Sequence, residues 1–266
     1  MSLATAPGPV GVGELLREWR QRRRLSQLEL AVDAEVSTRH LSFVETGRSR
    51  PSRELVLHLA EHLDVPLRER NALLLAAGYS PAFRAGALDA EDMGPVRSAL
   101  DRLLAGHEPF PAVVVDRGWD LVAANGSALA ILTDGVSPVL LEPPVNTLRV
   151  SLHPDGLAPR IANLAEYGAH LLLRLDRQAA LTGDASLAEL ATELRSYPGV
   201  VAGPVGVADA TSLLFVPLVL RSGDQQLTFF STLTTFGTAV DITIAELSVE
   251  AFFPADDATA AALGVG

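Results

Sequence analysis

The stretch from Arg20 to Pro51 constrains this chain more than any other, because it carries the signals of two short helices joined by a short turn. Ser26 can cap the first helix, and Glu29 stands three residues on, where a capping box places its acid. This helix is expected to end near Asp33, with Leu28, Leu30 and Ala31 as its apolar contacts.

The second helix of the stretch is predicted from Thr38 to Glu45. Ser37 can cap its start, and Gly47 stops it. Two helices this short cannot each bury a core alone. The pattern therefore predicts a helix-turn-helix, whose second helix enters the major groove of DNA.

The predicted second helix has two different faces at about 100° per residue. Leu41 and Val44 point towards the first helix. The opposite face and its flanks carry Thr38, Arg39, His40, Ser42 and Phe43. A guanidinium suits guanine O6 and N7, hydroxyls suit several bases, and an aromatic ring can pack on a thymine methyl. The alternative is an ordinary solvated face of a small helical bundle.

The charge distribution agrees with a DNA-binding N-terminal part. The whole chain has a net charge of −11, but residues 1–80 hold 11 Arg against 10 acidic residues, and the remainder holds 10 Arg against 22. Arginines flank the motif on both sides: Arg22, Arg23, Arg24, Arg48, Arg50 and Arg53. Such clusters are placed to neutralise phosphates at the groove edges.

Residues 13–65 resemble the Cro/C1-type helix-turn-helix of the XRE regulators. The resemblance lies in Leu25-Ser26-Gln27-x-Glu29-Leu30-Ala31, Val36-Ser37, Leu41-Ser42, Glu45-x-Gly47 and Pro51-Ser52. It implies that Gln27 meets DNA near the backbone and that Arg20 and Glu45 form a structural pair. We therefore predict a double-stranded DNA operator, bound as a homodimer through Gln27, Thr38, Arg39, His40, Ser42, Phe43, Arg48 and Arg50.

The domain boundaries follow from changes in pattern. Residues 1–12 are expected to be a flexible arm, 13–80 the all-α five-helix DNA-binding domain, 81–105 a linker with a connecting helix, and 106–266 a second domain. Helices are expected from Gly13 to Arg23, Ser52 to Leu63, and Pro66 to Ala77 around the motif.

The second domain is predicted to be α+β, with an antiparallel sheet of about five strands and helices. Strands or extended pieces are expected at Ala112–Asp116, Trp119–Ala124, Leu148–Leu152, Ser212–Leu220, Gln226–Thr235 and Val240–Glu250. Helices are expected at Asn125–Leu132, Pro159–Thr182 and Ser186–Arg195, and a short closing helix or tail at Asp256–Leu263. Helices on one side of such a sheet would enclose a small cavity.

This half resembles the MmyB-like ligand-binding domain, a PAS-like module found behind this type of helix-turn-helix. The matching stretches include Arg117-Gly118-Trp119-Asp120, His153-Pro154-Asp155-Gly156, Glu193 to Pro198, Thr235 to Thr238 and Glu250 to Asp256. The resemblance implies a transcription regulator that binds a small apolar or fatty-acid-like ligand.

Candidate ligand-binding residues are Trp119, Asn125, Arg149, His153, Arg174, Phe229 and Phe236. Each has a structural alternative: a core Trp, a capping Asn, surface arginines, and a His that stands in a turn made by Asp and Gly. The arginines are candidates for a ligand carboxylate.

No catalytic residue, cofactor or metal site is predicted. The sequence has no G-x-S-x-G, Walker or H-E-x-x-H motif and no cysteine. Its longest apolar run is too short to span a bilayer, and no secretory signal opens it, so we expect a cytoplasmic protein without membrane contact. One alternative remains open: the second domain could serve only dimerisation or the docking of a partner.

Overall fold

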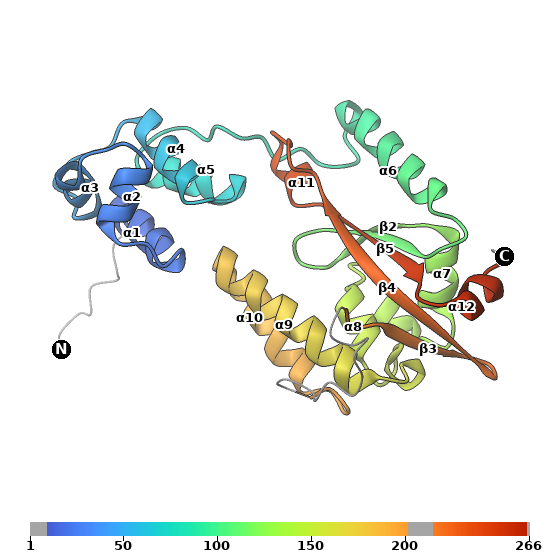
Figure 1. The fold of residues 1–266 in the computed structure, drawn as a ribbon. Helices are drawn as coiled ribbons and strands as arrows, with labels where there is room; N and C mark the ends of the chain where they lie inside the picture. The colour runs from blue at the N-terminus through green and yellow to red at the C-terminus, as the bar shows by residue number, and fades with distance from the viewer. Residues whose placement is uncertain (1–9, 202–214, 265–266) are drawn as a thin grey trace, which may run out of the picture. The chain divides into compact units, whose positions relative to one another are not determined.

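The computed structural model describes residues 10–201 and 215–264 (Figure 1). Contacts divide the chain into two compact units, one built mainly from the chain up to Ala85 and the other mainly from Gly86 onwards. None of the helices in the described ranges is long and apolar enough to cross a membrane.

The first unit is all-α. Its helices are α1 (Val12–Arg22), α2 (Gln27–Asp33), α3 (Thr38–Glu45), α4 (Arg53–His62) and α5 (Leu67–Ala76). They enclose one apolar core, in which Leu16, Leu30, Leu41, Leu59 and Leu73 are almost completely buried. Trp19 lies in the same core, as its place among the inward positions of α1 predicts.

The predicted helix starts of the motif are confirmed. Ser26 accepts from the backbone N–H of Glu29, and the Glu29 carboxylate accepts from the N–H of Ser26, which completes the capping box. Ser37 and Ser52 cap α3 and α4 in the same way through one hydrogen bond each. The prediction that Leu28 is one of the apolar contacts of α2 was wrong, because Leu28 is 61% exposed. Residues two apart on a helix point about 200° away from each other, so Leu28 cannot share the core-facing side with Leu30.

Helix α1 crosses the end of α3 at Gly13, where the two backbones come very close. A Cβ atom at Gly13 would lie 2.2 Å from the carbonyl oxygen of Val44 and 2.9 Å from that of Glu45. Both obstacles are backbone atoms, so neither can rotate out of the way. The packing of α1 against the end of α3 therefore requires glycine at position 13.

We expect Gly13→Ala to lower the free energy of unfolding of this unit by about 1–3 kcal/mol, the usual cost of overpacking. Gly11→Ser is the matched control, since nothing lies within 4 Å of a Cβ at Gly11. Serine is a preferred N-cap residue, so the control should stay within about 0.5 kcal/mol of wild type. Urea unfolding followed by Trp19 fluorescence, in a Trp119→Phe background, measures both. Equal stability of the two variants would contradict the close approach.

The second unit is built on a five-stranded antiparallel sheet with the order β2-β1-β5-β4-β3. Its strands are β1 (Ala112–Val115), β2 (Leu121–Ala124), β3 (Leu218–Ser222), β4 (Gln225–Thr235) and β5 (Ser248–Pro254). The predicted turn between β3 and β4 is confirmed: Ser222 pairs with Gln225, and Gly223 adopts φ +58°. The last strand, β5, thus lies at the centre of the sheet, between β1 and β4 (Figure 1).

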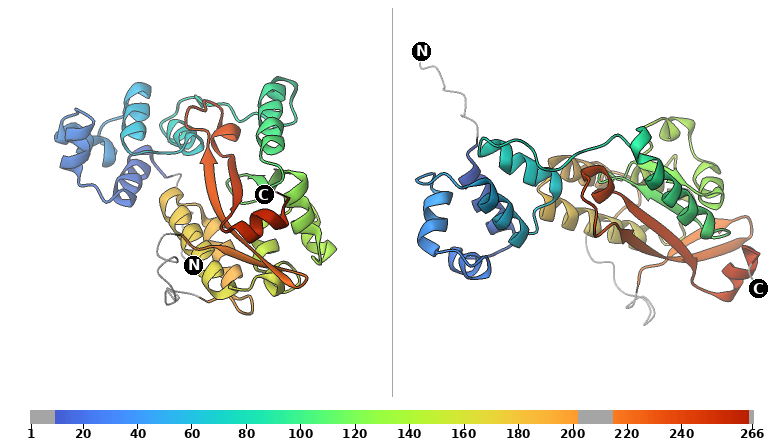
Figure 2. Two further views of the ribbon diagram at one scale, coloured as in Figure 1. Left: turned by 45° about the vertical axis from the view of Figure 1, so that its right-hand side comes forward. Right: turned by 90° about the horizontal axis from the view of Figure 1, so that it is seen from above.

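Helices cover one face of this sheet, as Figure 2 shows from two further sides. They are α7 (Gly126–Thr133), α8 (Thr147–Leu152), α9 (Leu164–Thr182) and α10 (Ala185–Arg195). Their apolar side chains form the main core with β1, β3 and β4. On the other face, Leu100 and Leu104 of α6 (Gly94–Gly106) pack on Val114 and Val249. The short α11 (Ile242–Ala245) precedes β5, and α12 (Asp257–Ala262) follows it beside β4. The expected fold class, an all-α helix-turn-helix domain plus an α+β PAS-like domain, is confirmed.

One predicted extended segment is helical, and a second is helical in its first half and a strand from Ser248 onwards. Leu148–Leu152 lies in α8, which Asn146 caps through the N–H of Arg149. The apolar residues of α8 alternate as in a strand, but this short helix is buried on several sides, so the alternation does not report its structure. The predicted strand Val240–Glu250 contains α11 in its first half. There Thr243 donates to the carbonyl of Gly86 (2.7 Å), and this tertiary contact outweighs the strand preference of β-branched residues.

The other boundaries shifted for identifiable reasons. The long helix begins at Leu164, not Pro159, because the chain at Ile161 forms a bridge to Leu220 beside β3. Asn163 holds this crossing, donating to the carbonyl of Pro217 and accepting from the N–H of Val219. The strand predicted from Ser212 begins at Leu218, after a proline that cannot donate to a ladder. Residues 212–214 lie outside the described ranges.

Candidate DNA-reading helix and ligand cavity

Helix α3 presents the face that its sequence predicts. Leu41 and Val44 are each 1% exposed and hold the helix to the core. The predicted DNA-contacting side chains of Thr38, Arg39 and His40 are exposed, and those of Ser42 and Phe43 are half-buried. The inward and outward sides of α3 are therefore those expected from the 3.6-residue period.

The aromatic ring on this face has two arginine neighbours. The guanidinium carbon of Arg39 lies 5.3 Å from the centre of the Phe43 ring, and that of Arg48 lies 6.0 Å away. Cation–π attraction over such distances holds both guanidinium groups near the ring. Phe43 therefore lies close to two guanidinium groups on the predicted DNA-facing side of α3.

A buried ion pair supports α3 from behind. Arg20 Nε donates to Glu45 Oε1 (2.7 Å), and its Nη2 donates to Oε2 (2.9 Å). Both residues are more than 90% buried, and the hydrogen bond with Glu45 raises the pKa of Arg20. Gln27 Nε2 also donates to Glu45 Oε2 (2.7 Å). The structural pair implied by the resemblance is confirmed. Gln27, which is predicted to meet DNA near the DNA backbone, is oriented by the same carboxylate.

Among the flanking arginines, Arg23 and Arg50 donate to carbonyl groups at the ends of α4 and α5. Arg50 donates to the carbonyl of Ala77 at the end of α5 and lies 5.5 Å from the Tyr79 ring. Arg23 donates to the carbonyls of Leu63 and Asp64 at the end of α4. These arginines close helix C-termini, where cations are favourable. Their place in the fold is therefore set by contacts that need no DNA.

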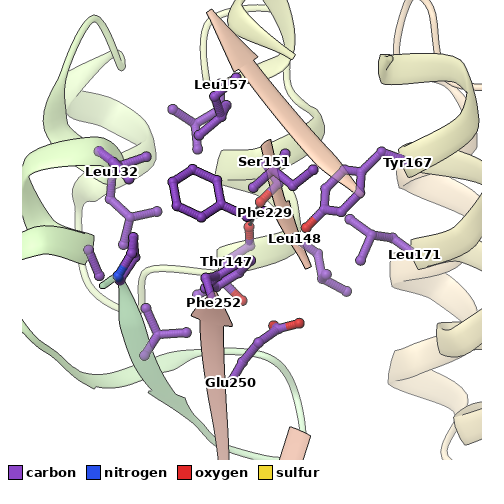
Figure 3. A pocket seen from close by; sticks show the side chains of 16 residues that line it. Leu132, Thr147, Leu148, Ser151, Leu157, Tyr167, Leu171, Phe229, Glu250 and Phe252 are labelled. Atoms are coloured by element: carbon purple, nitrogen blue, oxygen red, sulfur yellow. Dashed lines mark hydrogen bonds between the residues drawn. The ribbon is translucent and has the colours of Figure 1, made fainter. Parts of the chain in front are cut away.

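The second unit contains a cavity between the helices and the inner face of the sheet (Figure 3). Twelve of its sixteen lining residues are apolar: Pro111, Val113, Ala128, Ile131, Leu132, Leu148, Leu157, Leu171, Leu218, Leu220, Phe229 and Phe252. Its volume is about 60 Å³. A cavity of this volume holds a group of only a few heavy atoms, because a cavity that binds one benzene molecule has a volume of roughly 150 Å³. Apolar walls with a few polar groups are typical of ligand sites.

The four polar lining residues are Thr147, Ser151, Tyr167 and Glu250. Thr147 donates to the carbonyl of Trp119 (3.0 Å), and Ser151 donates to the carbonyl of Thr147 (2.8 Å), so both hydroxyl protons are used. Glu250 Oε1 accepts from Arg174 Nη1 and from Ser231 Oγ, each at 3.0 Å. Burial raises the pKa of Tyr167 far above its usual value, and the charge of Glu250 raises it further. Its hydroxyl therefore stays protonated.

Of the seven predicted ligand-binding residues, Phe229 lines this cavity. Trp119 is buried in the core, donates to Gln178 and carries the guanidinium of Arg174 over its ring at 4.4 Å. Asn125 caps α7 and bonds the backbone of Ala112 and Phe110. These residues stand next to the cavity lining as structural supports.

The remaining three predicted residues also have internal partners. Arg149 forms two hydrogen bonds of 2.8 Å with Glu193, and these lower the pKa of Glu193. His153 Nδ1 accepts from the N–H of Asp155, so the turn interpretation describes its geometry. Phe236 packs with the small core on the other face of the sheet.

The lining residues that were not predicted had signals in the sequence. Tyr167 lies three residues after Leu164 and four before Leu171, on the inner stripe of α9. Glu250 lies two residues before Phe252 in a strand, so both point to the same face. Glu250 is an acidic residue at an inward position of a strand. The sequence around it does not show that it is paired, because its partner Arg174 is distant in the sequence.

A helix-turn-helix with an exposed reading face, joined to a PAS-like domain with an internal cavity, defines a DNA-binding transcription regulator with a ligand-binding domain. Residues 96–264 match the family described as MmyB-like transcription regulator ligand binding domain, and residues 12–73 match a helix-turn-helix domain. The chain belongs to the MmyB-like transcription regulators. No curated protein matches it.

Proposed function

We propose that the second domain binds a small, largely apolar ligand in its cavity and that occupancy changes the affinity of the helix-turn-helix for its operator. The observation that supports this is the cavity itself: apolar walls and a few polar groups lie inside a domain that belongs to a ligand-binding family. Fatty-acid-like molecules fall within this class, provided that the cavity can widen beyond about 60 Å³.

A thermal shift of the full-length protein tests the ligand half of the proposal. A ligand that prefers the folded form raises the melting temperature in proportion to its concentration over Kd. Gel shifts with and without the same ligand then test the coupling to DNA. A domain that serves only dimerisation or partner docking would show neither effect.

We further propose that α3 reads the operator through Thr38, Arg39, His40, Ser42 and Phe43, that Gln27, Arg48 and Arg50 contact DNA at the edge of the groove, and that two copies bind a palindromic site. The exposed face of α3 and the arginines near Phe43 support this. A dimer would place two such helices in successive major grooves.

Arg39→Ala should weaken binding to DNA from upstream of the coding region by roughly 5- to 150-fold, the effect of one arginine–guanine pair. Arg102→Ala in α6 removes the same charge from an exposed position and should leave affinity within about twofold. Gel shifts at one fixed salt concentration provide the comparison. Equal affinities for wild type and Arg39→Ala would assign the reading face elsewhere.

A further inference from the structure

Strand β4 extends beyond its neighbour β3 at one side of the sheet. The pairing of β4 with β3 stops at Phe229, which faces Leu218, whereas the pairing of β4 with β5 continues to Thr235, which faces Ser248. Figure 1 shows β4 running on towards α11 beyond the end of β3. From Phe230 to Thr235, β4 is therefore paired with a strand of the described ranges on one side only.

The open side of β4 carries backbone groups that no strand of the described ranges uses. In an antiparallel strand the N–H and C=O of one residue point to the same side, and the side alternates along the chain. The carbonyl of Thr228 accepts from the N–H of Ala255 at the end of β5, so the even-numbered residues of β4 face β5. The residues that direct their N–H and C=O groups to the open side are consequently Ser231, Leu233 and Thr235.

Residues 231–235, here called the β4 edge, lack the features that usually protect an open strand. All of them are exposed. No charged residue and no proline occurs between Asp224 and Asp241, and the register with β5 continues to Thr235 without a bulge. Natural sheets block open edges with charges, prolines or bulges, because an unprotected edge is a template for another strand. The β4 edge is therefore suited to strand addition.

A second copy of the same chain is the partner that the charge distribution favours. Beyond residue 80 the chain holds 10 Arg against 22 acidic residues, so two copies repel each other over much of this surface. The uncharged β4 edge avoids that repulsion. A two-fold axis at Leu233 places Ser231 opposite Thr235 of the second copy, so all three outward-facing residues form hydrogen-bonded pairs. Thr232 then stands opposite Thr234 of the second copy, a favourable pair of side chains.

We propose that the β4 edge is a dimerisation surface, at which two copies of this chain join their sheets antiparallel about Leu233. The proposal rests on the proposed binding of a palindromic site by two copies and names the surface that holds them together. Main-chain hydrogen bonds supply the affinity in strand addition, and side chains that face each other set the specificity. Thr232 and Thr234 share the outer face of the sheet with Phe230, so charges placed there change the pairing without entering the core.

Sedimentation velocity of the full-length protein at micromolar concentration tests this, and we expect the wild type to be a dimer. The double variant Thr232→Lys/Thr234→Lys should raise the dimer Kd at least tenfold, because like charges then stand opposite each other twice. The double variant Thr232→Glu/Thr234→Glu should do the same. An equimolar mixture of the two variants should form dimers again, because each lysine then faces a glutamate.

A matched control places the same charge elsewhere in the second unit. Ser98→Lys/Leu103→Lys adds two lysines at exposed positions of α6, and this variant should dimerise as the wild type does. Melting curves of each variant alone confirm that it is folded. The mixture gives independent evidence, since unfolded chains could not restore a dimer by exchanging partners.

The outcomes separate this surface from the proposed binding by two copies. A lysine variant that dimerises like the wild type, a mixture that stays monomeric, or a dimer that only the α6 control dissociates overturns the assignment to the β4 edge. A wild type that is monomeric in solution but binds its operator as two copies also overturns it and leaves the proposed function standing. If the wild type is monomeric and one copy saturates the operator, both proposals fail.

Discussion

Glu45→Ala is expected to lower the free energy of unfolding of the DNA-binding domain by about 3–5 kcal/mol, because it leaves a buried guanidinium without its counter-ion. Arg20 is 8% exposed, and its guanidinium donates two hydrogen bonds to the carboxylate of Glu45. The same substitution releases Gln27, whose amide donates to Glu45 Oε2. A loss of this size is a large part of the stability of a small domain.

Fluorescence can follow this domain separately. The chain has two tryptophans, Trp19 in the helical core and Trp119 in the PAS-like domain. In a Trp119→Phe background, urea unfolding followed at Trp19 therefore reports on the helix-turn-helix. Glu61→Ala is the matched control, an acid at an exposed position of α4, and should cost less than about 0.5 kcal/mol. A Glu45→Ala variant as stable as this control would mean that Arg20 reaches water or another partner.

A double variant distinguishes charge burial from packing. Arg20→Leu combined with Glu45→Leu replaces the pair with apolar side chains. It should recover part of the stability that Glu45→Ala loses, since a buried ion pair can often be replaced at little cost, whereas a single unpaired charge cannot. No recovery would show that the hydrogen bonds to Leu25 and Gln27 contribute more than the charge.

Phe229→Ala is expected to destabilise the PAS-like domain by about 3–5 kcal/mol and to enlarge its cavity. Phe229 is 1% exposed, lines the cavity and contacts Phe252 edge to face. Its removal takes away both the transfer free energy of the ring and the packing around it. Unfolding followed at Trp119 in a Trp19→Phe background measures the loss.

The neighbouring residue of the same strand supplies the control. Phe230 points to the other face of the sheet, where it stacks on Phe253 and is only half-buried. Phe230→Ala should therefore cost less than about half as much. Phe229→Ala should also gain stability from benzene, because a ligand that fits the larger space favours the folded form. Equal losses for the two variants would contradict the position of Phe229 in the core.

Much of the DNA-binding domain could be predicted because its signals are local. The serine caps, the capping box with Glu29 and the inward Leu41 and Val44 all lie within a few residues of the structure that they specify. The errors arose where contacts between distant segments decided the structure. The crossing near Ile161 depends on β3, and the turn at Thr243 depends on a carbonyl near the start of the second unit.

The cavity lining was predicted less well for the same physical reason. Two glutamates, Glu193 and Glu250, each pair with an arginine, and the sequence alone does not distinguish them. Glu193 lies on α10 with a partly exposed side chain, whereas Glu250 is buried at the cavity. Sequence reasoning selected Arg149 and Arg174 as ligand contacts, but each is held by one of these carboxylates.

By itself, the sequence determined the helix-turn-helix, its caps and the face of α3, because periodicity and capping act within one or two turns of chain. It also determined that an α+β domain follows. Only the tertiary structure decided which side chains meet inside that domain. The sheet order places β5 between β1 and β4, and this pairing of distant strands brings Glu250 and Phe229 to one cavity, which Tyr167 of α9 also lines.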